Sequence, residues 1–213
     1  MSSHIQIPIE LPGGLSIHRS IEGVLDTNVW LIRQPSGVAV LIDPADNAPG
    51  IQSLIGDDDV ALVVVTHQHA DHIEALREIA KTTEADVVAG TPDCTAIEFH
   101  TSVRPDPVWH GDRIEVDDIV LDVIGLVGHT PGGIALALIT DGAPVHIFSG
   151  DSLFPGGPGK TLNPEDFQSL MTDLEEKIFD QYGDDTVILP GHGEGTTLGK
   201  ERSHIDEWWA RGW

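Results

Sequence analysis

The sequence predicts an α/β (α+β) fold built of two halves, each a group of short strands with a helix, and with the helices outside. Three observations predict it: apolar runs between turn residues, amphipathic stretches with helical spacing, and metal-ligating side chains directly after four of the runs. The chain has 213 residues, 40% of them hydrophobic, which suffices for one sizeable core. No repeat, low-complexity tract or linker divides it, so we expect a single domain over residues 1–213.

The first half begins with three predicted strands, at residues 15–22, 27–33 and 38–43. They are rich in β-branched and other apolar residues, and turn signals such as residues 34–37 separate them. The apolar run at residues 60–65 predicts a fourth, buried strand. Asp43 ends the third strand, where its carboxylate could orient a metal-bound histidine or cap a turn.

Helical spacing follows the fourth strand. Ile73, Leu76, Ile79 and Ala80 predict a helix over residues 73–80. Residues 85–89 then predict a strand, and residues 93–99 predict a short helix.

The second half contains three more predicted strands, at residues 119–127, 145–148 and 186–189. Residues 164–182 predict the clearest helix, because Pro164 stands at its start and one face is apolar. That face consists of Phe167, Leu170, Met171, Leu174, Ile178 and Phe179. Residues 200–210 predict a closing helix that packs on the body through its tryptophans.

The segment directly after the fourth strand is dense in metal ligands. It contains His67, His69, Asp71 and His72 within six positions. In an extended segment alternate side chains point the same way, so His67 and His69 can hold one ion together. Asp71 and His72 lie past the bend, where they can reach a second ion. Groups that are costly to desolvate at the edge of a core usually have a bound cation in compensation, so we predict a metal site.

Three further ligands occur in the same local setting. His129, Asp151 and His192 each follow an apolar run, and glycine immediately precedes each of them. Glycine permits a tight turn and a close approach of the backbone to a site. A lone histidine is more often structural than ligating, but the repeated setting favours metal binding for the whole set.

The order His-x-His-x-Asp-His, then His, then Asp, then His resembles the metallo-β-lactamase fold superfamily along the whole chain. The resemblance implies a four-layer αββα sandwich with two metal ions in a cleft along one edge of the sheets. It implies that His67, His69 and His129 bind the first ion. It implies that Asp71, His72 and His192 bind the second, and that Asp151 bridges both.

Within that superfamily the loops look like the glyoxalase II branch, especially its short bacterial members. The similar segments are residues 150–161, 190–193 and 196–202. This likeness implies a thioester substrate. Full-length glyoxalase II has a further helical domain that supplies part of its thiol-binding surface, whereas this sequence ends at Trp213.

The formal net charge of −24 exceeds what a two-metal site requires, so most acidic residues are expected on a solvated surface. Such a charge opposes binding to nucleic acid. The few cations are informative by contrast. Lys160, Lys200 and Arg202 follow two of the ligand strands, where they could bind an anionic substrate.

No apolar run approaches the roughly 20 residues that cross a bilayer, and no secretion signal begins the chain, so we expect no membrane partner and a cytoplasmic location. The lone Cys94 excludes an internal disulfide and agrees with a reducing compartment. The expected partner is a small acyl-thiol substrate. The sequence carries no indication of an oligomeric state.

The ligand set predicts a mechanism. Two divalent ions can lower the pKa of a shared water and hold it as hydroxide, which Asp71 and Asp151 would orient towards a metal-polarised carbonyl. A thiolate departs without a dedicated acid, which the motifs lack, so a thioester is favoured over an amide. We expect zinc, with iron or manganese as alternatives for the same ligands.

Other reactions and roles remain open from the residues. A persulfide dioxygenase would use one iron on His67, His129 and Asp151, although the complete second ligand set argues against it. Lactone hydrolases tend to carry a tyrosine where this chain has Phe154. A zinc-stabilised binding module would need closed, cysteine-rich sites, and the chain has one cysteine.

Overall fold

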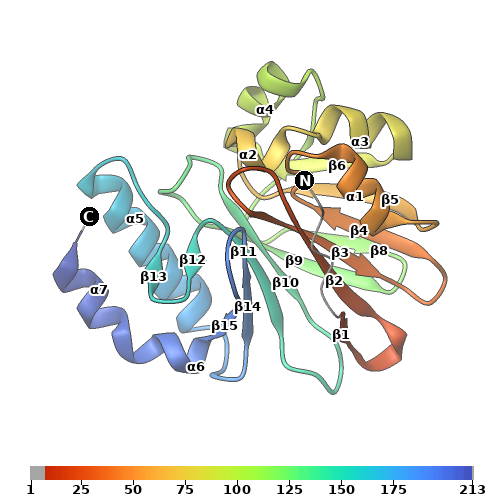
Figure 1. Cartoon of the computed structure of the whole chain (residues 1–213). Coiled ribbons are helices and arrows are strands. Elements are labelled where there is room, and N and C mark those ends of the chain that lie inside the picture. Colours follow the sequence, from red (N-terminus) through yellow and green to blue (C-terminus); the bar gives the residue numbers. More distant parts are fainter. Residues whose placement is uncertain (1–7, 213) are drawn as a thin grey trace.

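Two mixed β-sheets lie face to face between outer helices in the computed structural model, which describes residues 8–212 (Figure 1). Buried side chains from both sheets, among them Trp30, Ile32, Leu136 and Phe148, form one apolar cluster between them. A second cluster joins the first sheet to its helices, and a third joins the second sheet to its own. The predicted αββα sandwich is therefore confirmed.

The first sheet has seven strands in sequence order, antiparallel from β1 to β4 and parallel from β4 to β7. They are β1 Ile9–Glu10, β2 Ser16–Glu22, β3 Thr27–Arg33, β4 Val38–Ile42, β5 Asp59–Val65, β6 Asp86–Gly90 and β7 Asp106–Val108.

The second sheet has six strands in the order β15-β14-β11-β10-β9-β8, in which only β11 and β14 are parallel. They are β8 Arg113–Val116, β9 Ile119–Gly125, β10 Ile134–Leu138, β11 His146–Gly150, β14 Val187–Pro190 and β15 Thr196–Thr197. A separate ribbon pairs β12 Leu153–Phe154 with β13 Gly157–Pro158.

Helices cover the outer face of each sheet (Figure 1). Those on the first sheet are α1 Ala48–Ile55, α2 Ala70–Ile73, α3 Leu76–Thr83 and α4 Cys94–Thr101. Those on the second are α5 Pro164–Leu174, α6 Leu198–Glu201 and α7 Ile205–Arg211. A π-helical turn, Glu175–Phe179, continues α5, and short 3-10 turns precede α4 and join α6 to α7. No helix among residues 8–212 is long and apolar enough to cross a membrane.

Strand alternation explains why the central strands are apolar almost throughout. In β3, Val29 and Leu31 pack towards the helices, whereas Trp30 and Ile32 pack between the sheets. Both faces of the strand are therefore buried, and a continuous apolar run is the sequence that such a strand requires.

The predicted helix over residues 73–80 is divided into α2 and α3. The division occurs at Ala75, whose amide donates to the carbonyls of Pro44 and Ala45 (both 3.1 Å) instead of continuing a helix. The predicted helix over residues 200–210 begins two residues earlier and is likewise divided. The sequence analysis did not predict α1, β8 or β10, nor the short strands β1, β7, β12, β13 and β15.

The four ligand strands β5, β9, β11 and β14 end at one edge of the sandwich, where backbone hydrogen bonds join its two halves. The Ile134 amide donates to the Thr66 carbonyl (2.9 Å), and the Asn28 amide donates to the Gly191 carbonyl (2.7 Å). These bonds hold the loops after the strands beside one another, and the loops carry the predicted metal ligands.

Candidate metal centre

Three imidazoles from two loops form the first ligand group. His67 and His69 follow β5, and His129 lies between β9 and β10. One ring nitrogen of each lies within 4.8 Å of those of the other two, and the ring centroids are 4.5 to 4.9 Å apart. His67 is buried, while His69 is exposed, so the group opens to solvent on one side.

A second group lies beside it. Asp71 and His72 are on α2, and His192 follows β14. Asp71 Oδ2 is 3.1 Å from His192 Nε2 and 3.6 Å from His72 Nε2, and the two ring nitrogens are 3.2 Å apart. The rings of His67 and His72 have centroids 4.2 Å apart, so the two groups adjoin.

The carboxylate of Asp151 lies between the groups. Its Oδ2 is 3.5 Å from His129 Nε2 in the first group and 3.5 Å from His192 Nε2 in the second. Its Oδ1 is 3.4 Å from His72 Nε2. One carboxylate thus faces ring nitrogens of both groups, as the prediction of a bridging residue requires.

Asp43 orients the buried part of the site. Its Oδ2 accepts hydrogen bonds from His72 Nδ1 (2.9 Å) and the Thr66 hydroxyl (2.7 Å), and its Oδ1 accepts from the Thr66 amide (2.7 Å). The Thr66 oxygen in turn lies 3.0 Å from His67 Nδ1. Asp43 thus contacts His72 directly and His67 through Thr66, as the orienting role considered for it requires. These bonds turn the Nε2 atoms of both rings towards the cluster.

Backbone carbonyls orient two further rings in the same way. His129 Nδ1 donates to the Lys160 carbonyl (2.7 Å), and His192 Nδ1 donates to the Leu25 carbonyl (3.0 Å). With Nδ1 protonated, Nε2 keeps its lone pair for the cluster. The loops that contain Lys160 and Leu25 are thereby attached to the site.

Several inward-facing atoms lack a hydrogen-bond partner among the described residues. His67 Nε2, His129 Nε2 and Asp151 Oδ1 are all buried and make no hydrogen bond, although the last two lie 3.4 to 3.5 Å from another atom of the cluster. Buried polar atoms normally have hydrogen-bond partners, and three lone-pair donors without one that converge fit a bound cation. The two adjoining His and Asp groups are consistent with a dinuclear metal site.

The electrostatics of the two groups differ. Burial, together with the neighbouring imidazoles, lowers the pKa of His67 well below 6.5, and burial also lowers the pKa of His69. In the second group burial opposes protonation of His72, but the carboxylates of Asp43 and Asp151 raise its pKa to about 10. The hydrogen bond from His192 lowers the pKa of Asp71 to about 2. The lowered pKa values of His67 and His69 favour neutral imidazoles at these two positions, the form that binds a metal.

The glycines before the ligands are required by close packing. A Cβ on Gly191 would lie 2.3 Å from Asp151 Oδ1 and 2.6 Å from His72 Cε1. A Cβ on Gly150 would lie 2.6 Å from the Thr66 hydroxyl oxygen, and the backbone φ there is +49°. The close backbone approach predicted from the sequence is confirmed at both positions.

The sequence analysis missed Asp93, which joins the two loops of the first group. Its Oδ2 accepts from the Gln68 amide (3.0 Å) and the Thr130 hydroxyl (2.7 Å), and its Oδ1 accepts from the Gly132 amide (2.7 Å). The side chain is fully buried, and burial raises its pKa despite these bonds. No local signal marked it, because its partners are distant in sequence on both sides.

The three predicted substrate-binding cations are not brought together. The Lys160 carbonyl contacts His129, and the Lys160 residue is exposed. Lys200 and Arg202 lie at the other end of β14, because β15 turns back and places Thr197 opposite Val187, the first residue of β14. The prediction that Lys200 and Arg202 grip a substrate at the metal site is therefore wrong.

Arg202 instead stabilises the end of the helix that continues α5. Its guanidinium donates to the carbonyls of Phe179 (2.5 Å) and Tyr182 (2.9 Å) and to Asp184 Oδ1 (2.6 Å). Its Cζ lies 5.5 Å from the centre of the Phe179 ring. All three guanidinium nitrogens are therefore used within the protein.

We expect Arg202→Ala to lower the free energy of unfolding by about 2 kcal/mol, because charge-assisted hydrogen bonds are lost. Urea denaturation would measure the loss. Lys200→Ala, which removes an exposed cation from the neighbouring helix, is the control and should change neither stability nor activity. A raised KM in Arg202→Ala at unchanged stability would restore the substrate-binding assignment.

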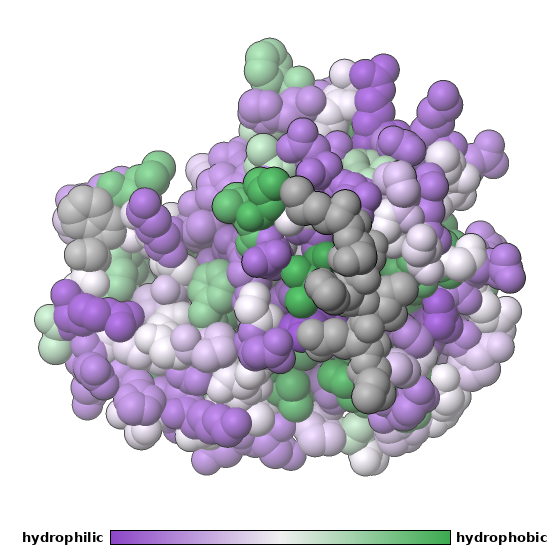
Figure 2. All heavy atoms as spheres, viewed as in Figure 1, coloured by the Kyte–Doolittle hydropathy of each residue, from purple (hydrophilic) through white to green (hydrophobic). Residues whose placement is uncertain are grey.

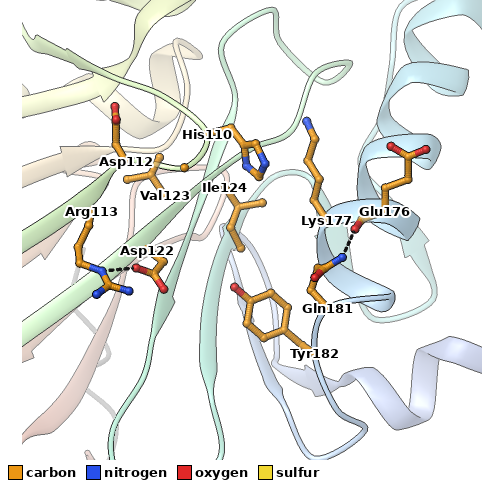
Figure 3. Close-up of a pocket in the computed structure, with 11 residues that line it drawn as sticks. His110, Asp112, Arg113, Asp122, Val123, Ile124, Glu176, Lys177, Gln181 and Tyr182 are labelled. Atoms are coloured by element: carbon orange, nitrogen blue, oxygen red, sulfur yellow. Dashed lines mark hydrogen bonds and ion pairs between the residues drawn. The ribbon is translucent and has the colours of Figure 1, made fainter.

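A separate pocket of about 580 Å³ lies between the second sheet and the π-helical turn (Figure 3). Its cations already have partners: Arg113 donates to Asp122 (2.7 Å), and Lys177 donates to the Gly125 carbonyl and pairs with Asp173 (both 2.8 Å). None of its lining residues belongs to the two ligand groups. We therefore place the chemistry at the ligand groups and not in this pocket.

Comparisons with known proteins agree with this geometry. The model of the Metallo-beta-lactamase superfamily matches residues 23–192. The hydroxyacylglutathione hydrolase GloC of Haemophilus influenzae is 28% identical, over 82% of this chain and 89% of that protein. The crystal structure of the BLEG-1 B3 metallo-beta-lactamase has a TM-score of 0.79 at 22% identity, covering 89% of this chain and 97% of that one. The crystal structure of TTHA1623 in a di-iron-bound form has a TM-score of 0.69 at 26% identity, and the match covers 92% of this chain and 97% of that one.

Proposed function

This chain belongs to the metallo-beta-lactamase superfamily, and from that premise we propose that it is a metal-dependent hydrolase of acyl thioesters that acts with two divalent ions, zinc in the first instance. The observation that carries the proposal is Asp151, whose carboxylate faces ring nitrogens of both ligand groups. The similarity to a hydroxyacylglutathione hydrolase supports the choice of thioesters within the superfamily.

We assign each ligand group to one ion. His67, His69 and His129 would hold the first, and Asp71, His72 and His192 the second, with Asp151 shared. A pair of divalent ions supplies Lewis acidity, which activates water and polarises a carbonyl at neutral pH. Besides binding metal, Asp71 and Asp151 would accept hydrogen bonds from the attacking water and so orient it.

The leaving group decides between thioester and amide. A thiol of pKa about 8.5 departs as the thiolate, whereas an amine must gain a proton as it leaves. The side chains of the two ligand groups are imidazoles and carboxylates committed to the ions, and none is left over as an acid. A thioester is the acyl substrate that such a site hydrolyses with least help.

Lys160→Ala should raise KM for a thioester with an anionic thiol about fivefold, with metal content and kcat unchanged. One exposed charge contact is worth about 1 kcal/mol, which corresponds to that factor. Steady-state kinetics and metal analysis would measure both quantities. Lys200→Ala is the matched control, because it removes the same charge from the far end of β14. An equal rise in KM for both substitutions would show that Lys160 acts through the overall charge of the protein and not through a contact with the substrate.

Thiol release from S-lactoylglutathione by zinc-loaded protein tests the proposal. We expect stoichiometric release of thiol and acid without oxygen consumption. The competing reaction is persulfide oxidation at one iron, so iron-loaded protein is assayed in parallel with glutathione persulfide under air and under nitrogen. Oxygen-dependent turnover of the persulfide, without thioester hydrolysis, would replace the hydrolase by a dioxygenase.

A further inference from the structure

Two loops that expose apolar side chains are attached to the ligand groups. The loop between β2 and β3 carries Val24 and Leu25, which are 77% and 60% exposed, and the loop before α5 carries Leu162, which is 79% exposed. Figure 2 shows hydrophobic atoms on both loops, with a notch in the outline of the molecule between them. Large apolar side chains that stay exposed at a site are typical of surfaces that bind a ligand.

Each loop is tied to a different ligand group. The Leu25 carbonyl accepts the hydrogen bond from His192, a ligand of the second group. The Lys160 carbonyl accepts a hydrogen bond from His129, which belongs to the first group. Leu162 follows Lys160 by two residues. The backbones of the two loops that carry the exposed apolar side chains are thus bonded to imidazoles of different groups.

The β2–β3 loop has a defined shape. Gly23 and Asp26, on either side of Val24 and Leu25, have φ angles of 75° and 55°. A Cβ on Gly23 would lie 3.2 Å from the Cβ of Asp46. A non-glycine residue with positive φ is uncommon, so the turn that presents Val24 and Leu25 is maintained by the surrounding structure.

The charges around the site point to the kind of group that these loops receive. The chain carries a net charge of −24, and of the three cations considered for substrate binding only Lys160 lies at the ligand groups. A small thiol carrier is polar and charged, and Lys160 suits it. The apolar loops suit the other half of a thioester, the acyl group.

We propose that Val24, Leu25 and Leu162 form an apolar mouth that selects thioesters with an apolar acyl chain. This inference rests on the proposed thioester hydrolysis and names its substrate class. A methylene group that is fully buried tightens binding by a factor of about four. Because an open mouth buries only part of each methylene, we expect the affinity to rise about twofold for each methylene added to the acyl chain.

The first test measures binding and not turnover. Calorimetry on the metal-free protein would compare S-methylglutathione with S-hexylglutathione, stable thioethers that place an alkyl chain where the acyl group would lie. Five additional methylenes predict about thirtyfold tighter binding of the hexyl compound, with a negative heat-capacity change. Leu25→Ser and Leu162→Ser should each reduce that preference at least about threefold. Equal affinity of the two compounds for the unmodified protein would overturn the proposal.

The second test measures hydrolysis of acetyl, butanoyl and hexanoyl thioesters of glutathione by the zinc-loaded protein. We expect kcat/KM to rise with chain length and the rise to flatten in both leucine variants. Ile139→Ser is the control: Ile139 is 48% exposed and follows the end of β10 that is remote from Thr66. Hydrolysis that ignores chain length would contradict the inference and leave the hydrolase intact. No hydrolysis at any length would contradict the proposed function, while the thioether measurement still decides whether the apolar mouth exists.

Discussion

Replacing Asp151 with alanine should remove both metal ions and abolish hydrolysis. Its carboxylate lies within 3.4 to 3.5 Å of ring nitrogens of His72, His129 and His192, which is the position of a ligand shared by the two groups. We expect metal content to fall to a small fraction and kcat/KM to fall by about 10³-fold or more, the equivalent of several kcal/mol of lost transition-state stabilisation.

Metal analysis by mass spectrometry, beside circular dichroism to verify folding, would measure the effect. Asp141→Ala is the matched control, because Asp141 is exposed in the loop before β11 whereas Asp151 follows the same strand. Both ions retained at normal occupancy in Asp151→Ala would refute the bridging assignment.

Replacing Asp43 with alanine should have the second largest effect. It should lower the free energy of unfolding, and it should weaken the binding of one metal ion more than that of the other. The change leaves the Thr66 amide, the Thr66 hydroxyl and His72 Nδ1 without their acceptor in a fully buried site. Unpaired buried donors cost about 1 to 3 kcal/mol each, so we expect a loss of about 4 kcal/mol in the free energy of unfolding. Since His72 loses its orientation, the second ion should be lost first.

Urea denaturation and the zinc-to-protein ratio would measure the two effects separately. Asp86→Ala, an exposed carboxylate at the start of β6, should change neither. Asp43→Asn should recover part of the stability, because one amide oxygen can still accept from Thr66. A full complement of zinc in a destabilised Asp43→Ala would limit Asp43 to a structural role.

The ligand strands were predictable because their signal is local. Each is an apolar run that is followed within a few residues by a metal-ligating residue. In three cases a glycine stands immediately before that residue. The packing explains the glycines, since a Cβ on Gly191 would collide with Asp151 and His72. The two halves with outer helices were predictable as well, because β3 and β5 are largely apolar and largely buried. The αββα order itself was what the family resemblance implied.

What the sequence did not reveal depends on the tertiary structure. β10 consists of Ile134–Leu138, in which alanine alternates with larger residues; the alanines fit under α5, which the sequence alone does not reveal. α1 begins with proline and glycine near its first turn, which resembles a loop. Asp93 acts through partners that are far away in sequence.

The error at Lys200 and Arg202 has a similar cause. Lys200 and Arg202 follow a ligand strand in the sequence, and this suggested that they lie at the site. The short strand β15 instead reverses the chain and takes both residues to the far end of β14. Lys160 remains at the site because the carbonyl of its own residue binds a ligand imidazole. A loop's direction, and not its place in the sequence, decides what its side chains can reach.

The most direct test of the dinuclear thioester hydrolase is a zinc titration of metal-free protein with thiol release from S-lactoylglutathione as the readout. The two ligand groups predict that the initial rate rises until about two equivalents of zinc are bound per chain and then stays constant. A rate that is complete at one equivalent would contradict the shared role of both groups. Tight binding of two equivalents without any thiol release would leave the metal site in place and contradict the thioester reaction.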